Sequence, residues 1–306
     1  MDIAVIGSNM VDLISYIDNM PKEGETLEAP DFEIGCGGKG ANQAVAAAKM
    51  GSDVMMVTKV GDDLFADNTI QNLESYGIDT EYTHKVPGTS SGVAPIFVDP
   101  ESQNRILIIK GANQYLSPED VDLAAEKLKQ CSLIVLQLEI PLQTIYRAIE
   151  FGNEHGIPVI LNPAPASKDL DFSYVCKCDF FIPNESELEI LTGMPVKTEE
   201  QIKAAASTLI NKGVKDVIVT MGSRGVMWVT KEDVQMVNSH KVSAIDTTGA
   251  GDAFTGCFAH YLAKDGDVSH AIKMATAFAA LSVTKRGTQA SYPSLDEVEQ
   301  LVAMRA

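Results

Sequence analysis

The residues best suited to chemistry lie in the stretch Asp246 to Asp252, which reads Asp-Thr-Thr-Gly-Ala-Gly-Asp. Its small residues leave little side chain between the backbone and a ligand, and the apolar segment that follows predicts a buried helix. The first N–H groups of a helix have no partner within the helix and attract anions. Gly249, Ala250 and Gly251 are therefore expected to form an anion hole with Asp252 beside it.

A carboxylate next to an anion site repels the anion, so Asp252 needs a function. As a general base it would take a proton from a hydroxyl that attacks a phosphorus atom. The anion hole would then stabilise the charge on the transferring phosphoryl oxygens. The structural alternative is that Asp252 only caps the helix or pairs with its dipole. Glycine-rich turns before helices are common, so this stretch alone leaves both interpretations open.

A second glycine-rich turn spans residues 35–42 and reads Gly-Cys-Gly-Gly-Lys-Gly-Ala-Asn. The alanine-rich residues 43–50 after it predict a helix. The turn is not a P-loop, because Lys39 is followed by Gly40 rather than by Ser or Thr. We expect the backbone here to approach a ligand closely, with Lys39 and Asn42 facing it. The alternative is a tight turn from a strand into a helix.

The elements that must position these residues are short apolar runs that alternate with helical segments. Ile3–Ile6, Val54–Val60 and Leu133–Leu138 are almost wholly apolar, which is typical of parallel strands buried on both faces. The repeated strand–helix units predict an α/β fold with a parallel sheet covered by helices on both sides. In such sheets ligands bind where the strands end. The polar candidates lie at those ends: Asp12, Glu139, Asn184, residues 220–225 and residues 246–252.

Two further segments, 13–34 and 92–111, interrupt this pattern with short mixed-polarity runs. The second is predicted to form a hairpin of strands 92–98 and 105–110 around a turn at 99–104. We expect the two segments to form a small β-sheet lid, with residues 1–12, 35–91 and 112–306 as the main α/β domain. A sheet so small exposes its edges. It is therefore predicted to pair with another copy of the chain or to close over a ligand.

The composition excludes several classes of function. The chain has 306 residues, 45% of them hydrophobic and 22% charged, with a formal net charge of −18. That charge argues against sequence-independent nucleic-acid binding. Its five cysteines have neither disulfide nor zinc spacing, which indicates a reduced, cytoplasmic protein. The sequence shows no signal peptide and no apolar run long enough for a membrane span.

Taken together, the motifs resemble those of the ribokinase family of carbohydrate kinases. The resemblance spans nearly the whole chain and is carried by residues 37–42, 162–166, 183–187, 222–225 and 246–252. It implies an αβα sandwich with a β lid, and transfer of the ATP γ-phosphate to a sugar hydroxyl. It also implies Mg²⁺, a monovalent cation such as K⁺, a pentose and ATP as small-molecule ligands, and a homodimer through the lid.

The resemblance also implies roles for individual residues. Asp252 would deprotonate the 5-hydroxyl of the sugar, and Gly249, Ala250 and Gly251 would form the anion hole. The remaining matches are sugar-binding Asp12, Gly38, Lys39, Asn42 and Glu139; Asn184 and Glu187 near the phosphates and magnesium; Thr220, Gly222, Ser223, Gly225 and Gly251 on the nucleotide, with Thr276 at adenine; and Asp246, Thr248, Ser282, Lys285, Gly287 and Ser291 around the monovalent cation.

Structural alternatives stay open for three of these groups. Asn184 and Glu187 match the start of a helix and its capping partner, which needs no ligand. Glu139 is equally compatible with a solvent-exposed residue at a strand end. The turn at 220–225 also fits an ordinary hairpin.

One position departs from the family pattern. Ribokinases carry Asn two residues before the aspartate that matches Asp12, and this chain has Met10 there. Asn9 faces away in an extended strand. Methionine offers no donor, which suits a sugar that lacks one hydroxyl. We therefore expect phosphorylation of 2-deoxy-D-ribose at its 5-hydroxyl, with ribose as a weaker substrate. The alternatives are a kinase acting mainly on D-ribose, with Met10 as core packing, and a non-catalytic sugar sensor.

Overall fold

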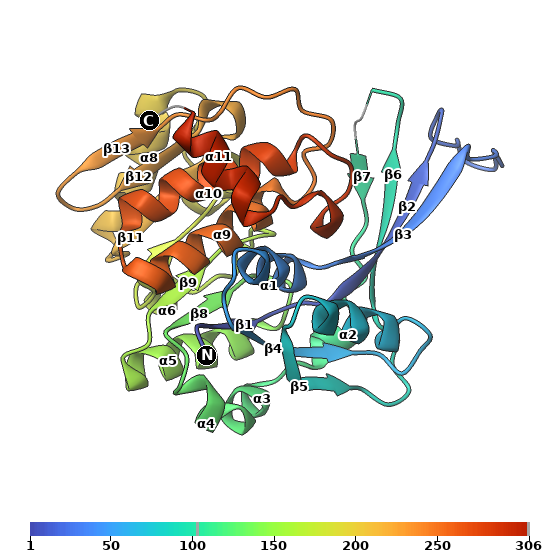
Figure 1. Ribbon diagram of the computed structural model, residues 1–306, viewed down its shortest axis with the longest axis horizontal. Coiled ribbons are helices and arrows are strands. Elements are labelled where there is room, and N and C mark those ends of the chain that lie inside the picture. Colours follow the sequence, from blue (N-terminus) through green and yellow to red (C-terminus); the bar gives the residue numbers. More distant parts are fainter. Residues whose placement is uncertain (102–103, 305–306) are drawn as a thin grey trace.

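The apolar runs form the centre of a nine-stranded sheet in the computed structural model, which describes residues 1–101 and 104–304 (Figure 1). The strands β1, β4, β5 and β8 to β11 are parallel, and β12 and β13 continue the sheet antiparallel. In spatial order they are β13 (Val234–Val237), β12 (Val226–Val229), β11 (Asp216–Thr220), β10 (Phe180–Phe181), β9 (Val159–Leu161), β8 (Leu133–Leu136), β1 (Ile3–Ile6), β4 (Val54–Val60) and β5 (Asp79–Lys85).

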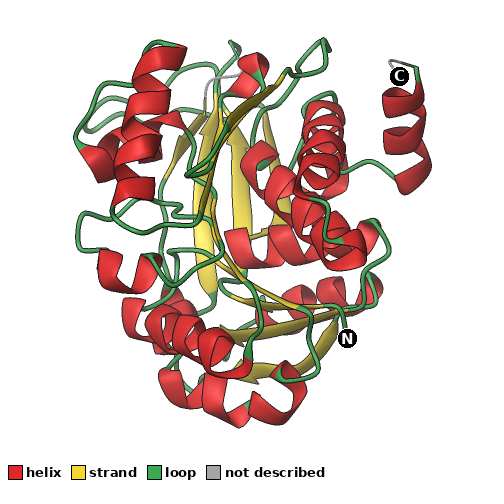
Figure 2. Cartoon of the chain, turned by 90° about the vertical axis from the view of Figure 1, so that its left-hand side faces the viewer, coloured by secondary structure: helices red, strands yellow, loops and turns green. Residues whose placement is uncertain are grey.

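Alternate residues of the central strand β1 enter two separate cores. Ile3 and Val5 pack against the helices on one face of the sheet, whereas Ala4 and Ile6 pack against the helices on the other face. Figure 2 shows the sheet between these two helical layers. The predicted αβα sandwich is therefore confirmed. The Ile3 face is covered by α1 (Lys39–Lys49), α2 (Ala66–Ser75), α9 (Ala250–Asp265), α10 (Val268–Ser282) and α11 (Leu295–Ala303), and the Ala4 face by α3 (Pro118–Leu123), α4 (Ala125–Leu128), α5 (Leu142–His155), α6 (Phe172–Val175), α7 (Glu185–Thr192) and α8 (Glu199–Asn211).

Two helices, α1 and α9, touch closely because a glycine lies at their contact. A Cβ at Gly256 would come within 2.3 Å of the Gln43 carbonyl oxygen. The helix α1 begins at Lys39, earlier than the predicted residue 43, after the N-cap Gly38 with φ 88°. This contact brings the N-terminal turns of the two helices together beside the strand ends.

A separate four-stranded sheet stands beside the large one (Figure 1). In spatial order it contains β3 (Asp31–Gly37), β2 (Met10–Tyr16), β6 (Gly92–Val98) and β7 (Asn104–Ile106). It begins at Met10 and includes Gly37, so its strands extend beyond the predicted limits of 13 and 34. The second strand of the predicted hairpin is shorter than expected, and its turn includes residues 102–103, which lie outside the described residues. The division into a main domain and a lid stays a prediction.

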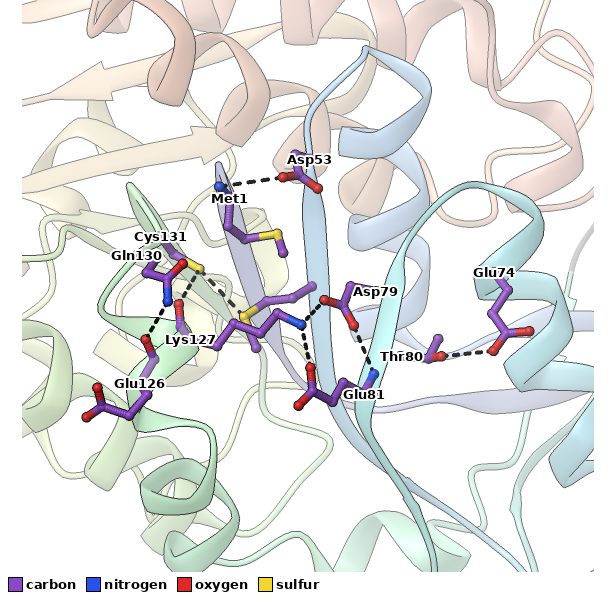
Figure 3. Close-up of polar contacts among 11 residues, drawn as sticks. Met1, Asp53, Glu74, Asp79, Thr80, Glu81, Glu126, Lys127, Gln130 and Cys131 are labelled. Atoms are coloured by element: carbon purple, nitrogen blue, oxygen red, sulfur yellow. Dashed lines mark hydrogen bonds and ion pairs between the residues drawn. The ribbon is translucent and has the colours of Figure 1, made fainter.

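Ion pairs lie at the edge strand β5 and at the start of the chain. Lys127 of α4 forms ion pairs with Asp79 and Glu81 of β5, and the Met1 amino group lies 3.5 Å from Asp53 (Figure 3). We did not predict β5, since its polar sequence lacks an apolar run. Within the described part of the chain, all five cysteines are free thiols and no helix is both long and apolar enough to cross a membrane.

Candidate active site

Two adjoining cavities lie where the two sheets meet the ends of α1 and α9. Cavity A has a volume of about 200 Å³ and cavity B one of about 140 Å³. Lys39, Gly249 and Asp252 line both of them. All the residues predicted to hold the sugar line cavity A: Met10, Asp12, Gly38, Lys39, Asn42, Glu139 and Asp252.

Asp252 lies in the first turn of α9 and is only 5% exposed. Its Oδ2 accepts a hydrogen bond of 3.1 Å from Asn42 Nδ2, and its Oδ1 accepts one of 3.0 Å from Gln43 Nε2. The N-cap of α9 is Gly249, with φ 73°, rather than Asp252. The hydrogen bonds of Asp252 therefore disfavour the interpretation that it merely caps its helix.

The other carboxylates of cavity A are also buried. Glu139 Oε2 accepts hydrogen bonds from Ser8 Oγ at 2.5 Å and from the Lys39 backbone N–H at 2.9 Å. Glu139 is 3% exposed, so the solvent-exposed alternative for it is wrong. Burial, aided by the charges of Glu139 and Asp252, raises the pKa of Asp12 to about 7.

Lys39 is a partly buried cation that lines both cavities. The carboxylate of Asp252, with smaller contributions from Glu139 and Glu187, raises the pKa of Lys39. The lysine therefore stays charged at neutral pH. An ammonium group in this position can neutralise an anion that reaches the junction of cavities A and B.

Met10 forms an apolar part of the wall of cavity A. It is 1% exposed and lies on β2 between Gly37 of β3 and Gly92 of β6. Ala94 and Ile96 extend the same wall. The backbone of the neighbouring Asn9 is instead held by the Asn113 side chain through bonds of 2.9 and 3.0 Å, and Asn9 is absent from the lining of cavity A.

In cavity B, Asn184 and Glu187 form a capping box at the start of α7. Asn184 Oδ1 accepts from the Glu187 backbone N–H, and Glu187 Oε2 accepts from the Asn184 backbone N–H, both at 2.8 Å. The capping alternative is thus realised, and both residues line cavity B as well. Burial raises the pKa of Glu187.

Only some of the residues predicted to bind the nucleotide line cavity B. Thr220, Gly251 and Asn184 line it. The turn formed by Gly222, Ser223 and Gly225 follows Thr220 but lines neither cavity. Gly225 has φ 98°, and a Cβ there would lie 2.0 Å from the Val237 carbonyl oxygen, so the turn itself requires this glycine. Thr276 is buried in α10, lines neither cavity, and donates its hydroxyl to the Ile272 carbonyl at 2.7 Å.

Asp246 joins the two backbone segments predicted to hold a monovalent cation. Its carboxylate accepts from the backbone N–H groups of Thr248 and Gly287, each at 2.9 Å. The other predicted members have local partners: Lys285 pairs with Glu297 at 3.2 Å, and the Ser282 and Ser291 hydroxyls donate to the carbonyls of Ala279 and Thr288. Among the described residues no group of three or more His, Cys, Asp or Glu side chains is arranged for a metal.

Comparison with known proteins identifies the family. The model of the pfkB family of carbohydrate kinases matches residues 1–295. The chain belongs to this family. A deoxyribokinase from Salmonella typhi is 66% identical over 304 residues, covering 99% of each chain, and a mouse ribokinase is 39% identical over 295 residues, covering 95% of this chain and 91% of the mouse protein.

Solved structures of ribokinases have a fold similar to that of this chain. The Thermotoga maritima ribokinase superposes with a TM-score of 0.90 at 37% identity, covering 99% of both chains. The Arabidopsis thaliana ribokinase, solved with ribose and ATP, has a TM-score of 0.91 at 32% identity and covers 98% of both chains.

Several residues that bond to the lining of cavities A and B were not predicted from the sequence. Ser8 binds Glu139, Gln43 binds Asp252, and Gln289 donates to Asn42 Oδ1 at 2.9 Å. Asn104 of β7 donates to the Thr248 hydroxyl at 3.0 Å, which links the small sheet to the turn before α9. Their partners lie far away in the sequence, so no local pattern marked them.

Proposed function

We propose that this chain transfers the γ-phosphoryl group of ATP to the 5-hydroxyl of 2-deoxy-D-ribose, and that D-ribose is a slower substrate. The observation that carries the proposal is the apolar wall formed by Met10 beside Asp12 in cavity A. A sugar without a 2-hydroxyl leaves no polar group unpaired against that wall. The 66% identity to a deoxyribokinase supports the same substrate.

In this proposal cavity A holds the sugar. The Asp12 carboxylate accepts hydrogen bonds from its hydroxyls, the Asn42 amide donates to them, and Gly38 allows the backbone to approach them. The 5-hydroxyl lies against Asp252, which takes its proton as the oxygen attacks the γ-phosphorus. The two amide donors on Asp252 hold its carboxylate in place for this step.

Cavity B holds the phosphates. The N–H groups at Gly249, Ala250 and Gly251 are proposed to face the γ-phosphoryl oxygens, although that of Ala250 also donates to the Thr247 carbonyl at 3.3 Å. Lys39 neutralises charge that develops at the junction of the cavities. Magnesium, when bound with ATP, neutralises the phosphates further. Both Glu187 oxygens already accept hydrogen bonds from Asn184, so we propose that Glu187 reaches the ion through water.

The adenosine part of ATP is proposed to follow Thr220 along the turn of Gly222, Ser223 and Gly225 toward Thr276. Potassium is proposed to bind backbone carbonyls of the segments that Asp246 joins. A cation there stabilises the adjoining anion-hole turn electrostatically. Omission of potassium is therefore expected to lower activity, which an assay in potassium, sodium or tetramethylammonium chloride measures.

We propose further that the small sheet is a lid and that its outer face joins a second copy in a homodimer. Directly paired residues share one face of a sheet. Asp12, Ala94 and Ile96 on the inner face line cavity A, whereas Phe32 and Ile34 on the outer face are 53% and 56% exposed. Replacing both Phe32 and Ile34 with Ser is expected to yield a monomer by analytical ultracentrifugation.

A coupled assay of ADP release with 2-deoxy-D-ribose, D-ribose, D-fructose and adenosine tests the proposed function. The highest kcat/KM is expected for 2-deoxy-D-ribose, followed by D-ribose. A higher value for D-ribose would favour the alternative in which Met10 is core packing. Binding of sugar without any ADP release would instead identify a non-catalytic sensor.

A further inference from the structure

The carboxylate of Asp252 receives one side-chain amide on each oxygen, and only one of the two donors borders a cavity. Asn42 lines cavity A and donates to Oδ2. Gln43 donates to Oδ1 but is fully buried and lines neither cavity A nor cavity B. Gln43 therefore acts on the site through the residues it contacts, namely Asp252 and Asn162, of which Asn162 lines cavity B.

The direction of the Gln43 amide is fixed by a chain of hydrogen bonds that starts at a backbone carbonyl. The Ile182 carbonyl can only accept, and it accepts from Asn162 Nδ2 at 2.8 Å. Asn162 Oδ1 therefore faces Gln43 Nε2, from which it accepts at 3.1 Å. Gln43 Oε1 in turn accepts from Gln137 Nε2 at 2.7 Å. A flipped Gln43 would place its oxygen against two acceptors, one of them the Asp252 carboxylate.

The members of this chain lie on rigid parts of the fold. Gln137, Asn162 and Ile182 each directly follow a strand of the parallel sheet, namely β8, β9 and β10. Two glycines leave room for them. A Cβ at Gly7 would lie 2.1 Å from Gln137 Oε1, and a Cβ at Gly256 would strike the backbone of Gln43.

Gly256 also explains why Gln43 meets Asp252. Residues four apart lie on the same face of a helix, so Gly256 places the Asp252 side of α9 against α1. The close contact between these helices therefore sets the distance between the Gln43 amide and the carboxylate.

We propose that Gln43 is a positioning residue of the phosphoryl transfer: by holding Oδ1, it fixes the plane of the Asp252 carboxylate toward the junction of cavities A and B. The chain of Gln137 and Asn162 keeps the amide in its donating orientation. This inference rests on the proposed function, in which Asp252 is the general base.

Gln43→Met tests the proposal, because methionine fills a similar volume without a donor. The variant is expected to lower kcat by about tenfold or more, since a freely rotating base is aligned less often. KM for 2-deoxy-D-ribose and for ATP should stay within about twofold, as Gln43 touches neither cavity.

The matched control is Thr144→Val, which removes another fully buried hydrogen bond, from the Thr144 hydroxyl to the Leu116 carbonyl, outside both cavities. It is expected to lower the melting temperature without changing kcat. If Gln43→Met leaves kcat unchanged, whether or not its melting temperature falls as in this control, the proposal is overturned.

Gln137→Met provides a second test if Gln43→Met does not fold. It removes only the donor to Gln43 Oε1. A smaller loss of kcat with unchanged KM would support the proposal, and an unchanged kcat would overturn it. Wild-type protein that phosphorylates no pentose would refute the proposed function instead, so the two failures are distinguishable.

Discussion

Cavities A and B adjoin at Asp252, yet their polar residues are held in different ways. In cavity A the hydrogen bonds join distant segments: Asn42 and Asp252 are 210 positions apart, and Gln289 and Asn42 are 247 apart. In cavity B the main contact joins Asn184 and Glu187, which are three positions apart.

This difference affects how far geometry supports function. A capping box stabilises the start of any helix, so the bonds between Asn184 and Glu187 need no ligand to explain them. Buried carboxylates such as Asp12 and Asp252 cost free energy in the folded protein, and no helix end requires them at these positions. The geometry therefore argues more strongly for the roles in cavity A than for those in cavity B.

The largest expected effect comes from Asp252→Asn. Loss of the proposed general base should lower kcat by about a hundredfold to ten-thousandfold. Sugar and ATP should still bind, because the other residues of both cavities remain. Steady-state kinetics and calorimetric binding measure the two quantities. A kcat within tenfold of wild type would show that another residue is the base. The geometry would then argue no more strongly for function in cavity A than in cavity B.

Met10→Asn is expected to have the next largest effect. An amide at this position offers the 2-hydroxyl of ribose a partner, so the ratio of ribose to deoxyribose kcat/KM should rise by about tenfold to a hundredfold. Met236→Asn on β13, which is 37% exposed and lines neither cavity A nor cavity B, is the matched control and should leave the ratio unchanged. An unchanged ratio in Met10→Asn would make Met10 a core residue.

The contrast also explains how much could be predicted from the sequence. Apolar runs such as Ile3–Ile6 indicated the parallel sheet, and the spacing of Asn184 and Glu187 indicated the start of α7, because both signals are local. The strand Asp79–Lys85 was missed because its residues are polar and only partly buried. Gln43 was missed because its partners come from two strand ends and from α9, which only the folded chain brings together.

The pH dependence of sugar binding gives a more moderate effect. The pKa of Asp12 is raised to about 7 by burial and by Glu139 and Asp252, so protonation below pH 7 removes a hydrogen-bond acceptor. KM for 2-deoxy-D-ribose should therefore rise as pH falls below about 7, by at most about tenfold per pH unit. Asp12→Asn should bind sugar weakly at every pH. A KM that is constant between pH 5.5 and 8.5 would contradict this role.

The same shift affects stability. The folded pKa of Asp12 lies above the unfolded value of 3.8, so the folded state binds the proton more tightly. The contribution of Asp12 to the free energy of unfolding should therefore decrease as pH rises from about 4 to about 7, and stay low above pH 7. Asp12→Asn should melt at a higher temperature than wild type at pH 8, as measured by calorimetry.

The smallest expected effect separates the two interpretations of cavity B. Glu187→Gln keeps a side chain that can complete the capping box, so the melting temperature should change by no more than a few degrees. The loss of charge should raise the Mg²⁺ concentration needed for half-maximal activity several-fold. Titration of Mg²⁺ at fixed ATP measures this.

The matched control is Gln201→Glu, the reverse substitution in another capping box, that of Thr198 and Gln201 at the start of α8. This capping box lines neither cavity A nor cavity B. It should leave the Mg²⁺ requirement unchanged. If Glu187→Gln also leaves the requirement unchanged, Glu187 is only a capping residue. The negative charge of the phosphates in cavity B would then be neutralised by Lys39 and the N-terminus of α9. Contacts between distant segments position both of these groups, as they position Asp252.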